Sequence, residues 1–112
     1  MSETFEILVV APTEKQRRDW VNILGYTVSK ITGGFSVYEG AGGWAGKNGV
    51  TLFEPHTRLI AYCPEDVCAR ELFNLMSHTI SQYKYNCQQE VVLVVLNGEI
   101  LMLENIPENL DL

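Results

Sequence analysis

The sequence is short of basic residues and of long apolar runs, and each shortage argues against a class of partner. Eight lysines and arginines stand against fourteen aspartates and glutamates, so the formal net charge is −6. A protein that binds DNA or RNA in general carries a basic surface for the phosphates, so we expect no DNA or RNA partner. The longest apolar run, Val91–Leu96, is far shorter than the roughly 18 residues needed to cross a bilayer, so we expect no membrane partner.

Cysteine and histidine are also scarce. The three cysteines, Cys63, Cys68 and Cys87, cannot all pair within one chain, and their spacing does not match that of zinc sites. We expect reduced, mostly core-facing thiols in a cytoplasmic protein, which agrees with an acidic N-terminus that lacks the basic region of a signal peptide. Neither a metal nor a cofactor is expected.

The pattern of apolar residues predicts the elements of one domain, 1–112. The predicted strands are Phe5–Ala11, Phe35–Glu39, Val50–Glu54, Thr57–Cys63, Glu90–Leu96 and Glu99–Leu103, with Pro55 breaking the ladder between the third and the fourth. Thr13 and Gln16 match a capping box at the start of a helix. That helix ends either at Leu24 or at Ile31, and we favour the longer form because Gly33 and Gly34 follow it.

Pro64-Glu65-Asp66 indicates the start of a second helix, which runs to about Tyr83. Asn97-Gly98 is typical of a type I′ turn in a hairpin. The acidic tail, 104–112, is expected to be loosely ordered.

The resulting order, βαββαβ with a short extra C-terminal strand, predicts a ferredoxin-like fold of the α+β class. Such a fold is an antiparallel sheet with both helices on one face. Strands as apolar as VVLVVL need their other face covered, so we expect a homo-oligomer, a trimer or a dimer, that packs sheet to sheet.

Six short patterns carry a resemblance that spans somewhat over half of the chain. They are Gly34-Phe35-Ser36-Val37, Gly42-Gly43-Trp44, Glu54, Thr57-Arg58, Tyr83-Lys84 and Gln89-Glu90. The set resembles an uncharacterised family of small bacterial ferredoxin-like proteins, which implies a fold but no activity. In architecture the chain is also similar to PII-type signalling proteins. That similarity implies a trimer that binds nucleotides in clefts between subunits, beside a long loop between the second and third strands.

The glycine-rich segment Gly40–Gly49 is the predicted ligand loop. Gly42 and Gly43 allow backbone amides to approach an anion closely, Trp44 offers a stacking surface and Lys47 adds a donor. The alternative is a plain hairpin connection with the tryptophan packed back on the sheet. Ten residues exceed the usual 2–5 of a hairpin loop, so the two interpretations are about equally supported.

A second group of candidate residues flanks this loop. Glu54, His56 and Arg58 alternate, so an unbroken strand would place them on one face, where Glu54 could accept from a ribose hydroxyl and Arg58 could hold a phosphate. The alternative is a solvated face with one ion pair. Tyr38 and Gln89 complete the predicted ligand-binding set.

Motifs of nucleophilic catalysis are missing: the chain has no Gly-x-Ser-x-Gly and no cysteine beside a histidine. We therefore predict a non-enzymatic protein that binds a nucleotide-derived small molecule at subunit clefts, for sensing or sequestration. A single small domain suits sequestration, including a phage-type sponge for a host nucleotide signal. One alternative is a small enzyme that uses Glu54 and His56 as acid and base. Another is a protein–protein adaptor that uses the sheet edge and the acidic surface.

Overall fold

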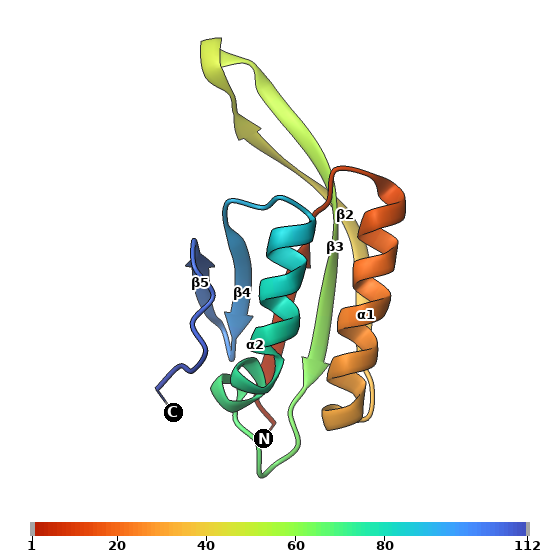
Figure 1. The fold of residues 1–112 in the computed structure, drawn as a ribbon, viewed down its shortest axis with the longest axis vertical. Helices are drawn as coiled ribbons and strands as arrows, with labels where there is room; N and C mark the ends of the chain where they lie inside the picture. Colours follow the sequence, from red (N-terminus) through yellow and green to blue (C-terminus); the bar gives the residue numbers. More distant parts are fainter. Residues whose placement is uncertain (1, 112) are drawn as a thin grey trace.

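Two helices cover one face of a five-stranded antiparallel sheet (Figure 1). The computed structural model describes residues 2–111, with the side chains of Trp44 and Lys47 excepted. In chain order the elements are β1 (Thr4–Val9), α1 (Glu14–Thr32), β2 (Ser36–Ala45), the 3₁₀ helix η1 (Lys47–Gly49), β3 (Thr51–Tyr62), α2 (Ala69–Asn86), β4 (Val92–Leu96) and β5 (Glu99–Leu103). The strand order β2-β3-β1-β4-β5 confirms the predicted ferredoxin-like α+β plan.

The core lies between the sheet and the helices. Every second residue of β1 and of β4 is buried, because alternate side chains of a strand point to the same face. Leu24 and Val28 of α1 and Phe73, Met76 and Ile80 of α2 close the core from the other side. The opposite face of the sheet has no helix over it (Figure 1).

The first helix starts and ends as predicted. The Thr13 side chain accepts a hydrogen bond from the Gln16 backbone N–H at 3.1 Å, which satisfies one of the free N–H groups of the first turn. The helix continues through Gly25 to Thr32, which confirms the longer form. Gly33 ends it with a φ of 88°, a conformation that glycine adopts at little cost.

The second helix begins later than Pro64-Glu65-Asp66 predicted, so that start is wrong. The Val67 N–H donates to the Pro64 carbonyl at 3.0 Å and closes a turn instead. The helix begins at Ala69, whose N–H donates to the Glu3 carboxylate at 2.9 Å, and Cys68 is its N-cap. The hydrogen bond from Ala69 to Glu3, a residue before β1, is a long-range contact that local sequence does not reveal.

The C-terminal hairpin matches its prediction closely. Asn97 and Gly98 have φ of 50° and 87°, as a type I′ turn requires, and they join β4 to β5. The following tail lies along α2. The Asn74 side chain donates to the Leu110 carbonyl at 3.0 Å and accepts from the Leu110 N–H at 2.6 Å.

The predicted loop Gly40–Gly49 is wrong, because most of it is strand. β2 pairs with β3 as far as Ala45 opposite Thr51, which leaves only a tight turn. Residues 40–56 extend beyond the last pair of β1 and β3, Val9 with Thr57, and project from the body as a two-stranded ribbon (Figure 1). We call this ribbon the arm.

Contacts and strand pairing within the arm explain why its glycines and its proline do not interrupt its two strands. His56 covers the backbone at Gly40 and Gly42, and Phe53 covers Gly43, so aromatic rings supply the packing that glycine lacks. Pro55 pairs with Ala41 where β3 has only one neighbouring strand. Proline is tolerated there because alternate N–H groups of such a strand have no ladder partner to lose.

Candidate functional site

A pocket of about 420 Å³ opens where the arm leaves the body. We call it the arm-base pocket. Three segments that are far apart in the sequence line it: residues 11–14 with Arg17 from the start of α1, residues 53–55 from the arm, and residues 87–89 after α2. Its volume lies in the range of roughly 300–1,000 Å³ that is typical of small-molecule sites.

Two predicted site residues meet in this pocket. Glu54 comes from β3 and Gln89 from the loop before β4, and both line the arm-base pocket. The Gln89 side chain donates to the Cys87 carbonyl at 2.9 Å and its N–H donates to the Lys84 carbonyl at 3.0 Å, so this glutamine is held by the end of α2.

Sequence reasoning missed Arg17, which also lines the pocket. It is a buried cation with a relative exposure of 9%. Its Nη2 atom lies 3.5 Å from an oxygen of Glu39, which in turn accepts from the Thr57 hydroxyl at 3.1 Å. Helical spacing could have revealed it, since Arg17 lies seven residues before Leu24 on the stripe that faces the sheet.

The residues beneath the pocket are neutral rather than reactive. The Tyr83 hydroxyl accepts from the Val10 N–H at 2.8 Å and donates to the Val10 carbonyl at 3.0 Å. Burial raises the pKa of Tyr83 strongly, and the negative charges that Cys87 and Glu54 can carry raise it further. Burial also raises the pKa of the Cys87 thiol, so the structure gives no support to a catalytic thiolate at this position.

The other predicted residues do not join the pocket. Arg58 binds Glu6 through a 2.8 Å ion pair and lies over the Tyr38 ring at 5.5 Å. His56 rests on the backbone of Gly40. Glu54, His56 and Arg58 do alternate along β3, and of the three only Glu54 is among the residues that border the cavity at the arm base.

The glycine-rich segment has a different conformation from the one predicted. Gly42 and Gly43 pair with Glu54 and Phe53 in the ladder of an edge strand, so the segment around them is strand and not loop, and their roles in ligand binding stay predictions. The side chains of Trp44 and Lys47 lie outside the described residues, and their predicted roles stay predictions.

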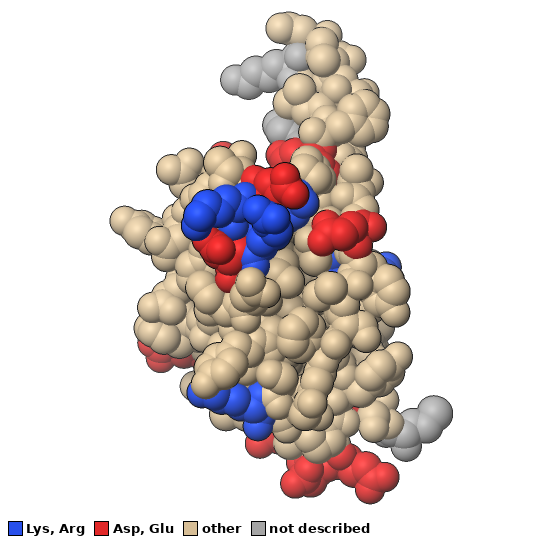
Figure 2. All heavy atoms as spheres, turned by 90° about the vertical axis from the view of Figure 1, so that its right-hand side faces the viewer, with Lys and Arg blue, Asp and Glu red and all other residues tan. Residues whose placement is uncertain are grey.

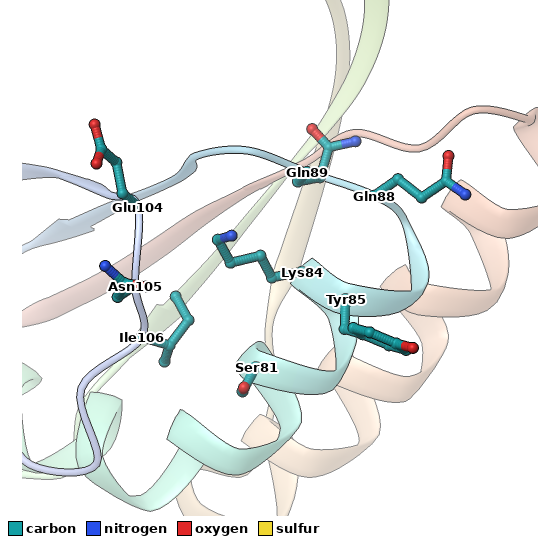
Figure 3. Close-up of a pocket in the computed structure, with 8 residues that line it drawn as sticks. All are labelled: Ser81, Lys84, Tyr85, Gln88, Gln89, Glu104, Asn105 and Ile106. Atoms are coloured by element: carbon teal, nitrogen blue, oxygen red, sulfur yellow. The ribbon is translucent and has the colours of Figure 1, made fainter.

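A second hollow, of about 480 Å³, lies between the end of α2 and the tail (Figure 3). Lys84 points toward it from α2, while the Tyr85 ring points away from the other residues that are drawn (Figure 3). Gln88 and Gln89 border both this hollow and the arm-base pocket. The two cavities are therefore neighbours at one end of the molecule.

Charge around the base of the arm is mixed. On the face shown in Figure 2, lysine and arginine side chains intermingle with aspartate and glutamate below the arm. One pair in this region of α1 is Lys15 with Asp19, at 2.8 Å. Among the described residues, no group of three or more histidine, cysteine, aspartate or glutamate side chains is placed to hold a metal, and no helix is long and apolar enough to cross a membrane.

Neither a protein-family model nor a curated protein matches the sequence, whereas solved structures do. A phage SAM lyase in complex with S-methyl-5′-thioadenosine matches with a TM-score of 0.64 and 15% identity, over 91% of this chain and 88% of that one. Its apo state matches with a TM-score of 0.61 and 15% identity, over 90% and 87%. The chain shares their fold.

The periplasmic divalent cation tolerance protein CutA from Archaeoglobus fulgidus matches more weakly. The TM-score is 0.48 at 11% identity, over 92% of this chain and 82% of that one. The fold shared with the phage SAM lyase and the strand order of this chain agree with the ferredoxin-like architecture predicted from the sequence.

Proposed function

We propose that the protein binds a nucleoside-derived small molecule of the S-adenosyl class in the arm-base pocket. The observation that carries the proposal is the meeting of Glu54 and Gln89 at the N-terminus of α1, in one cavity of suitable size. Support comes from the similar fold of the phage SAM lyase, which was solved with S-methyl-5′-thioadenosine. The role that follows is sequestration or sensing of such a molecule.

The chemistry of the pocket suits this class of ligand. Phe53 is 77% exposed and lines the cavity, so its ring can stack on a purine in the manner predicted for Trp44. The Glu54 carboxylate can accept from a ribose hydroxyl or lie beside a sulfonium cation. Gln89 offers an amide close by, and its anchoring by the end of α2 keeps that amide in place.

A homo-oligomer, a trimer or a dimer, belongs to the same proposal. The helix-free face of the sheet presents Tyr62, Ile100 and Met102, each more than half exposed. A second copy that covers this face would remove these side chains from water. The arm would then lie against a neighbouring subunit, which would make the arm-base pocket a cleft between subunits.

The test measures thermal unfolding with S-adenosylmethionine, S-methyl-5′-thioadenosine, AMP and cyclic dinucleotides. A ligand at 100 times its Kd stabilises the folded state by about 2.7 kcal/mol, so we expect a clear rise in Tm with an S-adenosyl compound. Glu54→Gln should reduce the rise. Glu65→Gln, an exposed change in the turn before α2, is the matched control and should not. A panel without any shift would refute the proposal.

Cleavage of the same ligand is a second candidate function. It is favoured by the Glu54 carboxylate, which borders the pocket and can act as a general acid or base. Incubation with S-adenosylmethionine, denaturation and mass spectrometry separate the two candidates. Intact ligand indicates sequestration, whereas release of S-methyl-5′-thioadenosine indicates cleavage.

A further inference from the structure

Arg17 is unusually buried for an arginine, and its guanidinium makes few hydrogen bonds and ion pairs with other described residues. The residue is nine-tenths buried, yet its Nε–H has no hydrogen-bond partner among the described residues. Its one ion pair with another described residue, Glu39, is long at 3.5 Å, and the Glu39 side chain is itself well exposed. A buried, unpaired donor on a charged group is costly, so the fold alone gives little reason to keep it there.

The position of Arg17 gives it a use. Its side chain lines the arm-base pocket together with Thr13 and Glu14, the N-cap and first residue of α1. The start of a helix carries a partial positive charge, and here a buried guanidinium adds a full one beside it. A guanidinium offers five donors in a fixed plane, far more than the single long contact with Glu39 engages.

We propose that Arg17 is the anion-binding end of the arm-base pocket, and that it selects ligands with a carboxylate or phosphate attached to the nucleoside. This inference rests on the proposed function and adds to it the part of the ligand that is recognised. Glu54 and Phe53 then face the nucleoside, while Arg17 and the start of α1 face the anionic group. S-adenosylmethionine carries such a group in its amino-acid tail, and S-methyl-5′-thioadenosine does not.

The test compares three ligands by titration calorimetry: S-adenosylmethionine for a carboxylate, AMP for a phosphate, and S-methyl-5′-thioadenosine for neither. A charge-assisted hydrogen bond predicts that one of the two ligands with an anionic group binds the wild-type protein roughly tenfold to 100-fold more tightly than S-methyl-5′-thioadenosine. The ligand whose preference depends on Arg17 identifies the group that is recognised, carboxylate or phosphate. Arg17→Gln should abolish the preference and leave the affinity for S-methyl-5′-thioadenosine unchanged.

Two further variants keep the test decisive. Arg18→Gln removes an exposed arginine from the same turn and should keep the preference, which excludes a general effect of charge. If Arg17→Gln does not fold, as judged by circular dichroism, Glu39→Gln replaces it. Glu39→Gln removes the carboxylate that competes for Arg17, so it should strengthen binding of the ligand with the recognised anionic group and leave binding of S-methyl-5′-thioadenosine unchanged.

Different failures have different meanings. Equal affinity of the wild-type protein for charged and uncharged ligands would overturn the role of Arg17 and leave the proposed function standing. An equal loss of all ligands in Arg17→Gln, or no selective gain in Glu39→Gln, would likewise overturn it. Absence of binding by all three ligands would refute the proposed function itself.

Discussion

Replacement of Tyr83 by phenylalanine tests the account of the region beneath the pocket. The hydroxyl joins α2 to the end of β1 through two hydrogen bonds to Val10, at 2.8 and 3.0 Å, and these residues are 73 positions apart. The ring itself is buried and packs near Trp20, with centroids 6.1 Å apart. Phenylalanine keeps this ring contact and removes only the hydroxyl.

The expected loss follows from the groups left behind. Both the N–H and the carbonyl of Val10 would lose the Tyr83 oxygen as partner, and an unsatisfied buried group costs roughly 1–3 kcal/mol. Val10 is only partly buried, so water can satisfy part of the deficit and we expect a loss of about 2 kcal/mol. For a chain of this size that corresponds to a fall in Tm of roughly 6–12 °C.

The pH dependence gives a second, independent signature. The pKa of Tyr83 is raised in the folded protein, first by burial, whereas an unfolded tyrosine ionises near its ordinary value of about 10. The stability that the neutral hydroxyl contributes is therefore complete below about pH 10 and is lost as the pH rises beyond it. Phenylalanine cannot ionise, so the stability gap between wild type and variant should shrink above pH 10.

Urea unfolding at pH 8 and between pH 10 and 11 measures both effects. Tyr85→Phe is the control, because that tyrosine is 84% exposed and should unfold like the wild type at every pH. A Tyr83→Phe variant as stable as wild type at pH 8, or a gap that stays constant to pH 11, would refute the reasoning.

Three other predictions concern local features. Thr13→Ala removes the N-cap of α1 and should cost about 1 kcal/mol in urea unfolding, whereas Thr13→Ser should cost little. Asn74→Ala breaks both bonds to Leu110, so the amide of Leu110 should lose its protection in hydrogen exchange; unchanged protection would contradict the contact. Gly40→Ala would place a Cβ 2.8 Å from the His56 ring and should displace it, seen as a shift of the imidazole NMR signals, while Gly34→Ala, with open space at its Cβ and no left-handed φ, should leave those signals in place.

Local sequence was enough to predict α1 and the C-terminal hairpin. Thr13 and Gln16 are three residues apart and form the cap on their own, and the adjacent residues Asn97 and Gly98 adopt the positive φ of their turn type. Such features depend on a few adjacent residues, so no knowledge of the tertiary structure is needed to find them.

The arm and the start of α2 could not be found in this way. The glycines of the arm are poor strand formers, but they pair with the opposite strand, and the rings of His56 and Phe53 from that strand pack against them. The start of α2 depends on a hydrogen bond from Ala69 to Glu3, 66 residues earlier. In both places a long-range contact overrides the local preference.

The candidate site was predicted in part. Glu54 and Gln89 were singled out, but nothing in the sequence indicates that they line one cavity across the end of β1. The Arg58 guanidinium could bind a phosphate as well as the Glu6 carboxylate. The register of β3 on β1 pairs Arg58 with Leu8 and so brings its side chain to Glu6, two residues away on the same face. Arg17 was overlooked because a charged residue on an apolar helical stripe was not weighed as a candidate.

Residues near both ends of the described chain are hydrogen-bonded to α2, and this has a practical consequence. Glu3 caps the first turn of α2 and Leu110 is bound to Asn74 in its second, whereas residues 87–89 of the arm-base pocket follow its last turn. The helix has 18 residues, so about 27 Å separate its two ends. A dye or an immobilisation handle attached near either end of the described chain would therefore lie far from the arm-base pocket. Surface-based binding assays could immobilise the protein through one end or the other and compare the two measured affinities.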